Sequence, residues 1–453
     1  MSERKILLRI IDVVVVLGAL DLVGVVFDYD YFIIHDQRRT SSIVLSVYLL
    51  FFATVFELYN LHRASRIMST LRSAVTTGSV TCLVYLLTPF LTPVLPEKRI
   101  QILYFYLAVT LSLLLWRAIY IKFFASSKFN KKIILIADAC DASLIKQSLQ
   151  DADPNYKIIG FINTDPALES NDHLDIKQFS INDAQKLFQN RSITEVVVAS
   201  NQSEGITSNL YRWLIELVED GHSVREYTQV YEEMTDRVPV QYVGKDFYKY
   251  FPFARNNQNR LYLVYHRLFD LVTSIIGLLV CLLIIPFVVL GNFLGNKGSL
   301  FYSQERVGVN RKVFKIIKFR TMVKDAEKSG AQFAMENDVR VTKFGKFLRA
   351  TRIDEFPQFW NILKGDMSVI GPRPEREVFV EQLSEKIPFY ETRHVVKPGL
   401  TGWAQVKTRY GVTEGDHLRK LQYDLYYIKK RSVFLDIRII IKTLSTVIFL
   451  KGQ

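Results

Sequence analysis

The sequence has few of the residues that build covalent or metal-held scaffolds. Its 453 residues include only three cysteines, Cys82, Cys140 and Cys281, which lie far apart and form no Cys-x-x-Cys pair. This spacing excludes a disulfide scaffold and a zinc ribbon. The seven histidines show no ligand spacing either. Hydrophobic residues make up 49% of the chain, which excludes a disordered protein.

Acidic residues are scarce in the C-terminal part of the chain. The last 198 residues carry 32 basic and 18 acidic side chains, whereas the first 255 carry 26 and 27, so the net charge of +13 arises entirely after residue 255. Such a surplus predicts anionic partners, namely phosphorylated substrates or anionic lipid headgroups. A basic surface without a special role is the alternative. Nucleic acid is not expected as a partner, because a membrane anchor restricts access to it.

Long apolar runs dominate the N-terminal part, and the mean hydropathy of the chain is +0.11. Four stretches come close to the ~20 residues that a helix needs to cross a bilayer. They are Ile6–Phe27, Ile43–Leu61, Val75–Leu95 and Ile102–Phe124. The first has no small-residue cleavage site and is not a signal peptide. It does contain Arg9, Asp12 and Asp21, for which packing against a neighbouring helix is favoured over a functional role.

Clusters of basic residues predict the orientation of these spans. Arg4 and Lys5 precede the first span, Arg63 and Arg66 lie between the second and third, and Lys122 ends the fourth. All three clusters fall on one side, which is therefore cytoplasmic. An even number of spans places everything after residue 128 in the cytoplasm.

Residues 131–250 show a different pattern, in which apolar strands alternate with helical stretches. Lys132–Ala137, Lys157–Asn163 and Ile193–Ser200 are typical of buried strands, which predicts a Rossmann-like parallel sheet. A dinucleotide site needs a glycine-rich turn after the first strand, but that turn reads Ala-Asp-Ala-Cys over residues 137–140. A regulatory, folding or oligomerisation role is therefore favoured over nucleotide binding.

A fifth apolar stretch, Leu271–Leu290, has the length of a transmembrane helix. Basic residues flank both of its ends, so both ends are predicted to be cytoplasmic. Pro286 interrupts the run and removes a helical hydrogen bond. We therefore predict a re-entrant helix over about 269–294, with its break at Pro286. A plain fifth span is the alternative, and it would carry the remaining residues across the membrane.

Two adjacent carboxylates, Asp354 and Glu355, mark the strongest candidate for chemistry. Pro357 and then Gln358–Lys364 predict a short helix that stops at Gly365, so the carboxylates would lie at its N-terminus. The helix dipole would favour their ionised forms there. A carboxylate of low pKa beside a metal-binding partner is a suitable nucleophile for phosphorus. A simple helix-capping role is the alternative.

Basic residues crowd around this pair in the sequence. They are Lys318, Arg320, Lys343, Lys346, Arg349, Arg352 and Arg373. Arginine suits bidentate contacts with phosphate, and Mg²⁺ takes oxygen ligands from carboxylates and substrate phosphates. The pattern predicts a pyrophosphate substrate together with a divalent ion.

Four motifs in the C-terminal part resemble those of the bacterial sugar transferases, the monotopic polyprenyl-phosphate phosphoglycosyl transferases. The matching stretches are Lys318–Met322, Val341–Glu375, Val396–Val406 and Tyr423–Ile437. The whole chain, with its predicted spans and α/β region, is similar to the large members of this family. Those members prime undecaprenyl phosphate for exopolysaccharide, capsule or O-antigen synthesis.

The resemblance implies a two-step reaction in which Asp354 attacks a UDP-sugar, releases UMP and passes the phosphosugar to undecaprenyl phosphate. It implies that Asp354 and Glu355 are the catalytic residues, that both contribute to a Mg²⁺ site, and that basic residues hold phosphates. The implied phosphate and substrate contacts are Lys318, Arg320, Arg349 and Arg373, and less securely Arg409 and Asp424. The family usually breaks its re-entrant helix at Ser-Pro, where this sequence has Ile285-Pro286.

Together these observations predict a membrane enzyme of mixed α and α/β class with three parts. Residues 1–128 would form a four-helix transmembrane bundle, 129–255 a Rossmann-like cytoplasmic domain, and 256–453 a mainly α monotopic catalytic domain. The expected partners are a UDP-sugar, undecaprenyl phosphate and lipids of the bacterial inner membrane; the sequence leaves a homodimer open. The alternatives are a membrane nucleotide-sugar dehydratase, whose glycine-rich loop is missing, and a non-catalytic scaffold.

Overall fold

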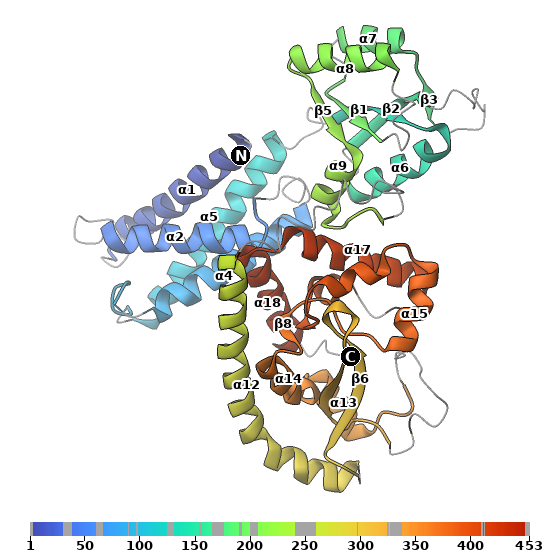
Figure 1. The fold of residues 1–453 in the computed structure, drawn as a ribbon. Coiled ribbons are helices and arrows are strands. Elements are labelled where there is room, and N and C mark those ends of the chain that lie inside the picture. Colours follow the sequence, from blue (N-terminus) through green and yellow to red (C-terminus); the bar gives the residue numbers. More distant parts are fainter. Residues whose placement is uncertain are drawn as a thin grey trace. The chain divides into compact units, whose positions relative to one another are not determined.

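The computed structural model describes most of the chain (Figure 1). The described residues are 3–29, 39–59, 67–88, 90–96, 98–124, 131–153, 156–164, 176–189, 193–199, 207–240, 260–296, 298–323, 326, 338–408, 411 and 413–448. The chain divides into two compact units. The first comprises 1–134, 144–160 and 182–195, and the second 135–143, 161–181 and 196–453. The boundary between them passes through the sheet of the middle region.

Four apolar helices make up the N-terminal part of the first unit. They are α1 (Glu3–Phe27), α2 (Arg39–Val55), α4 (Ile67–Leu87) and α5 (Arg99–Phe124). Their inward side chains share one apolar core. Within it Asp12 of α1 and Arg117 of α5 form a buried ion pair at 2.5 Å. This contact is the packing role that the sequence favoured for the ionisable residues of α1.

Three helices are long and apolar enough to cross a membrane, among the residues that the structure describes. They are α1, α5 and a third helix in the C-terminal part, α12 (Arg260–Gly295). Helix α2 is apolar but shorter. These helices fit a membrane protein, while the number of spans and the bundle stay predictions.

The middle region contains a five-stranded sheet with the strand order β3-β2-β1-β4-β5. Its elements are β1 (Lys131–Ala137), α6 (Ala139–Ala152), β2 (Tyr156–Asn163), β3 (Lys177–Gln178), α7 (Ile181–Gln189), β4 (Glu195–Val198), α8 (Ser208–Glu219) and β5 (Ser223–Glu226). Helix α6 joins the neighbouring strands β1 and β2, which is the crossover that parallel strands require. The three strands expected from sequence thus form the centre of the sheet.

A short helix after this sheet, α9 (Tyr227–Thr235), packs against the C-terminal part of the chain. Glu232 pairs with Lys429 at 2.5 Å, and Asp236 pairs with Lys407 at 2.9 Å. The indole nitrogen of the buried Trp403 donates to the carbonyl of Asp236. Val238 and Val240, which follow this helix, belong to the apolar core of the second unit.

Helix α12 is the longest element and runs for 36 residues with Pro286 inside it. Figure 1 shows it bending in its C-terminal part, where the sequence places this proline. Proline lacks the amide that would bond the carbonyl one turn earlier, which is the usual cause of such a bend. The helix is not divided into two at this point, so the predicted break is a bend within a continuous helix.

The remaining residues of the second unit fold against α12. The elements are the hairpin β6 (Phe301–Val307) and β7 (Val313–Phe319), then α13 (Lys343–Ala350), η7 (Ile353–Gln358), α14 (Phe359–Lys364), β8 (Ser368–Ile370), α15 (Glu377–Lys386), η8 (Tyr390–Val395), β9 (Gly399–Thr401), α16 (Trp403–Lys407), α17 (Glu414–Lys430) and α18 (Val433–Ile448). The hairpin is antiparallel, and β8 pairs with β9 in parallel. Most of this part is helical, as predicted.

The pattern of Val433–Leu450 fits an interfacial helix, apolar except for a polar side with Asp436, Arg438 and Lys442, and it fits an ordinary core helix equally well. In the structure, helix α18 (Val433–Ile448) buries Asp436, which is 2% exposed and accepts a 2.9 Å hydrogen bond from Tyr262 of α12. Arg438 and Lys442 lie over the ring of the buried Trp403. Helical periodicity alone could not reveal this, because the partners come from distant segments.

Candidate active site

The carboxylates Asp354 and Glu355 lie in η7, a 3₁₀ turn that continues directly into α14. Arg352, just before them, has the left-handed backbone conformation (φ 58°, ψ 14°) in which the chain leaves α13. This conformation costs a non-glycine residue ~1–2 kcal/mol and is often retained at functional sites. Gly365 ends α14 with φ of 98°. The sequence placed the short helix correctly but not the 3₁₀ turn that carries the dyad.

Glu355 lies among three cations. Its Oε1 is 3.2 Å from Arg373 and 3.8 Å from Lys318, and its Oε2 is 3.3 Å from Arg352. Burial alone would raise the pKa of Glu355, but the charges of Arg373, Lys318 and Arg352 outweigh burial and lower it. Glu355 is therefore ionised at neutral pH, as the sequence predicted for the pair.

The pKa of Asp354 is shifted in the opposite direction. Burial and the adjacent charge of Glu355 raise the pKa of this carboxyl above its usual value. Its Oδ1 is buried and has no hydrogen-bond partner among the described residues. The expectation of a low pKa at a helix N-terminus is thus wrong for Asp354, because burial beside a second carboxylate outweighs the dipole. An unsatisfied buried carboxylate oxygen is costly, so this atom is a candidate to accept a hydrogen bond or to bind a ligand, as Asp12 Oδ1 in the N-terminal helices also is.

Lys318 comes from the hairpin, opposite Tyr302 in the register of β6 and β7. Its ammonium group approaches Glu355, and burial together with the charge of Arg373 lowers the pKa of Lys318 to about 8. Lys318 is thus brought to the dyad, as the sequence predicted.

The other predicted basic residues do not all reach the dyad in the same way. Arg349 of α13 donates from Nε to Thr321 Oγ1 at 3.0 Å. Its charge opposes the rise in the pKa of Asp354. Arg320 follows β7, and its guanidinium lies against Gly298. Arg409 lies outside the described residues.

A second buried cluster, formed by Arg393 and Asp424, supports the backbone of Arg373. The carbonyl of Arg373 accepts a 2.9 Å hydrogen bond from Arg393, which also forms an ion pair with Asp424 at 2.8 Å. Asp424 is 1% exposed; burial raises its pKa to about 6, and the charge of Arg393 opposes this shift. Asp424 therefore supports Arg373 through Arg393. The structure does not bring Asp424 to the dyad, where a phosphate would bind.

Arg352 was predicted to lie near the pair, because it belongs to the same motif, but it was not among the implied phosphate contacts. Arg393 was not predicted at all. Arg393 lies between two motifs, and nothing in the sequence connects it to Asp424 or Arg373. Arg306 of β6 similarly donates to the carbonyl of Pro374 at 3.1 Å and steadies the turn after Arg373. Such contacts depend on the tertiary fold.

The dyad also provides the donor atoms that Mg²⁺ prefers. This ion is usually held by one or two carboxylates together with substrate phosphates. Asp354 supplies an oxygen without a partner, and Glu355 lies next to it. Among the described residues no group of three or more His, Cys, Asp or Glu side chains could hold a metal. The donor set therefore fits a metal ion only if the substrate supplies further ligands.

The part of the chain that contains the dyad also matches known proteins. Residues 261–450 match the family described as bacterial sugar transferase. A UDP-N-acetylgalactosamine-undecaprenyl-phosphate N-acetylgalactosaminephosphotransferase of Aeromonas hydrophila is 38% identical over 255 residues, which cover 56% of this chain and 59% of that protein. A UDP-glucose:undecaprenyl-phosphate glucose-1-phosphate transferase of Klebsiella pneumoniae is 41% identical over 189 residues, 41% of this chain and 40% of that protein. The chain thus spans about half the length of these relatives.

A shorter relative is matched over nearly its whole length. The uncharacterized sugar transferase EpsL of Bacillus subtilis (strain 168) is 36% identical over 190 residues, which make up 42% of this chain and 90% of that protein. The part of this chain that matches EpsL therefore corresponds to an almost complete protein. The family match over residues 261–450 contains the dyad and all three cations around Glu355. On these grounds the chain belongs to the bacterial sugar transferase family.

Proposed function

We propose that this protein is a polyprenyl-phosphate phosphoglycosyl transferase, which moves a phosphosugar from a UDP-sugar to undecaprenyl phosphate and releases UMP. The observation that supports it most is the unequal dyad: Glu355 is engaged by three cations, while a buried oxygen of Asp354 has no partner among the described residues. The printed names of the relatives from Aeromonas and Klebsiella support the substrate classes.

In the first step, a carboxylate oxygen of Asp354 attacks the sugar-linked phosphorus of the UDP-sugar. The bond from this phosphorus to the bridging oxygen breaks, and UMP leaves with that oxygen. The phosphosugar stays on Asp354 as an acyl phosphate. Burial makes this carboxylate a better nucleophile, because it has lost hydrating water that would have to be removed first.

In the second step, a phosphate oxygen of undecaprenyl phosphate attacks the same phosphorus. The acyl phosphate bond breaks, the Asp354 carboxylate is restored, and undecaprenyl-diphosphate-sugar is formed. This product would prime exopolysaccharide, capsule or O-antigen synthesis. The first UMP released per enzyme molecule therefore does not depend on the lipid acceptor, whereas further turnover needs undecaprenyl phosphate to restore the Asp354 carboxylate.

The surrounding cations neutralise the charge that the phosphates bring and the charge that develops in transfer. Arg373 and Lys318 are placed to contact phosphate oxygens, since they already converge on Glu355 from two different segments. Arg320, Arg349 and Arg409 would extend this phosphate site. Asp354 and Glu355 would hold a Mg²⁺ ion, which supplies further charge neutralisation when bound.

The apolar helices support a location in the bacterial inner membrane, with the active site on the cytoplasmic face where nucleotide sugars occur. We propose that the bent α12 is re-entrant and dips into one leaflet. Its exposed side chains, such as Leu282, Leu283 and Phe287, would then contact lipid. A homodimer is compatible with this arrangement.

The test is UMP release by the purified full-length protein in nanodiscs, with a panel of UDP-sugars that includes UDP-glucose and UDP-N-acetylgalactosamine. We expect one donor to release UMP, and Asp354→Asn to lower the rate by at least ~10³-fold, because the covalent step is lost. EDTA should also abolish release if the dyad holds Mg²⁺. A stoichiometric burst of UMP without undecaprenyl phosphate would support the covalent intermediate.

The matched control is Asp366→Asn, which changes a carboxylate outside the dyad that pairs with Lys364. It should retain wild-type release. Absence of UMP from every donor in folded protein would contradict the proposal and favour a scaffold. Full activity of Asp354→Asn would rule out Asp354 as the nucleophile.

A further inference from the structure

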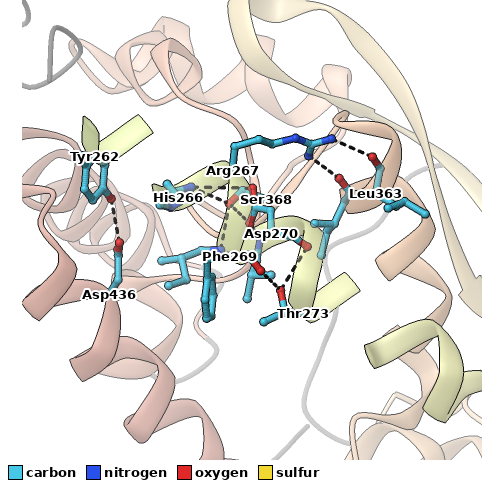
Figure 2. Close-up of polar contacts among 12 residues, drawn as sticks. Tyr262, His266, Arg267, Phe269, Asp270, Thr273, Leu363, Ser368 and Asp436 are labelled. Carbon is cyan, nitrogen blue, oxygen red and sulfur yellow. Dashed lines mark hydrogen bonds and ion pairs between the residues drawn. The ribbon is translucent and has the colours of Figure 1, made fainter. Parts of the chain in front are cut away.

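The first half of α12 carries polar side chains that face the rest of the second unit, although the helix as a whole is strongly apolar. Figure 2 shows Arg267 and Asp270 among their contacts. Asp270 is only 2% exposed. Charged groups on a helix of this kind are costly to keep unless they hold specific partners. The phosphoryl transfer chemistry described above uses neither residue.

Arg267 holds the end of α14. Its NH1 and NH2 groups donate 2.9 Å hydrogen bonds to the carbonyls of Ile362 and Leu363, respectively. These carbonyls belong to the last turn of a helix, where intrahelical donors run out, although that of Ile362 also accepts from the amide of Gly365 at 3.1 Å. Helix α14 has only six residues, too few to be stable alone. Arg267 therefore supports the helix into which the dyad turn runs.

Asp270 holds the beginning of β8. One oxygen, Oδ1, accepts from Ser368 Oγ at 2.9 Å and from the Val369 amide at 2.8 Å. Strand β8 has three residues and pairs only with the equally short β9 among the described elements. The chain continues from it through Gly371 and Pro372 to Arg373. Asp270 thus supports the strand that carries this arginine to Glu355.

A third contact fixes the start of α14 on the same helix. Gly277 lies directly beneath the ring of Phe359, and any side chain at position 277 would overlap that ring. Phe359 is the first residue of α14 and follows the last residue of the dyad turn. Both ends of α14 are therefore held by α12, at Gly277 and at Arg267.

We infer that Arg267 and Asp270 are positioning residues, which together fix the dyad relative to Arg373. One helical face holds two separate segments, α14 and β8, whose neighbouring residues meet at Glu355. Helix α12 then does more than contact lipid, since it sets the geometry of the active site. The catalytic consequence of this inference rests on the proposed function.

The catalytic test uses Arg267→Met and Asp270→Ala in full-length protein in nanodiscs. A displacement of about 1 Å at a reacting group lowers turnover roughly 100-fold, so we expect kcat to fall by about that factor while KM for the UDP-sugar changes much less. Arg267→Lys should recover part of kcat, because one donor can still reach a carbonyl. Asp270→Asn should also recover part, since its amide oxygen can accept both bonds.

The matched control is Thr273→Val, one turn along the same helix. Thr273 bonds only to carbonyls of its own helix, at Phe269 and Asp270, and the substitution preserves shape (Figure 2). It should keep wild-type kcat. A loss in Thr273→Val as large as in the other variants would overturn the inference, because any change in α12 would then act alike.

A second measurement does not depend on the reaction. In hydrogen–deuterium exchange without substrate, Arg267→Met should speed exchange at the amides of Gly365 and Asp366, which bond within the end of α14. Asp270→Ala should do so at Ser368 and Gly371, whose amides pair with the β9 segment. Amides of α17 should keep their wild-type rates.

UMP release tests the proposed function, and hydrogen–deuterium exchange tests the positioning role of Arg267 and Asp270 independently of it. If the wild type releases no UMP, the proposed function fails, and local exchange still decides whether Arg267 and Asp270 position these segments. Exchange that rises uniformly over the second unit would show a general stabilising role and overturn the inference. Unchanged kcat in both variants of an active protein would overturn it as well.

Discussion

Two buried clusters of opposite charges lie next to each other in the second unit, and they are built differently. In the first, Asp424 pairs with Arg393, which also donates to Tyr390 and to the carbonyl of Arg373. In the second, Glu355 is shared by three cations, and the adjacent Asp354 has a buried oxygen without a partner among the described residues. The carboxylate of the first cluster is neutralised within the fold, whereas the second cluster retains a carboxylate oxygen that can still accept a hydrogen bond or bind a metal ion.

This difference distinguishes a structural ion pair from the site that we propose to be catalytic. A buried pair with all its hydrogen bonds made is stable only as long as both partners are present. Two adjacent buried carboxylates repel each other, and this arrangement persists when function requires it. The comparison therefore predicts opposite responses to substitution in the two clusters.

The largest expected effect is the loss of stability when the ion pair is broken. Asp424→Ala leaves the Arg393 guanidinium buried without its carboxylate, which costs about 3–5 kcal/mol. For a unit of this size, each kcal/mol lowers Tm by about 2–4 °C, so thermal unfolding in detergent would register the change.

The matched variant is the double substitution Asp424→Leu with Arg393→Met. Replacing both members of a buried pair by apolar residues is often close to neutral, so most of the lost stability should return. Activity should stay low, because the carbonyl of Arg373 has lost its donor. A double variant as unstable as Asp424→Ala would show that the pair is not the source of the effect.

The next effect is a pH dependence of activity that the dyad imposes. Because the pKa of Asp354 is raised, the carboxylate that we propose as the nucleophile is lost by protonation at a higher pH than for an ordinary aspartate. Because the pKa of Lys318 is lowered to about 8, its charge is lost as the pH rises through that value. We expect a bell-shaped profile of kcat/KM in UMP release.

Lys318→Arg tests the alkaline side of this profile. An arginine stays charged over the accessible range, so the decline near pH 8 should disappear while the acid side is retained. The same decline in this variant would assign it to another group.

The smallest expected effect is a gain in stability when one of the two carboxylates of the dyad is replaced by a neutral side chain. Asp354→Asn removes one of two adjacent buried negative charges, and we expect stability to rise by about 1 kcal/mol although activity is lost. The measurement is again the thermal midpoint, with Asp366→Asn as the control. A decrease comparable to that of Asp424→Ala would mean that Asp354 serves the fold, as Asp424 does.

Much of the site could be predicted from the sequence, because its residues are close together along the chain. Asp354, Glu355 and Arg352 lie within four positions, and Lys318 and Arg373 belong to short basic motifs. The short helix ending at Gly365 followed from local signals. The central strands of the middle sheet also followed, since a run of apolar residues bounded by polar turns has few other solutions.

Other features could not be predicted, because they arise between distant segments. The position at a helix N-terminus predicted a low pKa for both carboxylates of the dyad. In the structure, burial raises the pKa of Asp354, while three cations lower that of Glu355. The contact of Asp424 with Arg393, 31 positions away, could not be read from any local pattern. The pattern around Asp436 left an interfacial and a core helix open, and the hydrogen bond from Tyr262, 174 positions away, is what shows its burial.

The sequence by itself determined which chemical groups this protein has, and that they are concentrated in a basic C-terminal part preceded by apolar helices. Composition and local motifs are sufficient for this, because they reflect hydrophobicity, charge and turn geometry within a few residues. Only the tertiary structure decided which carboxylate is neutralised and which is left with a free oxygen. That outcome depends on burial and on charges brought together from separate elements, and neither is encoded in any short stretch of the chain.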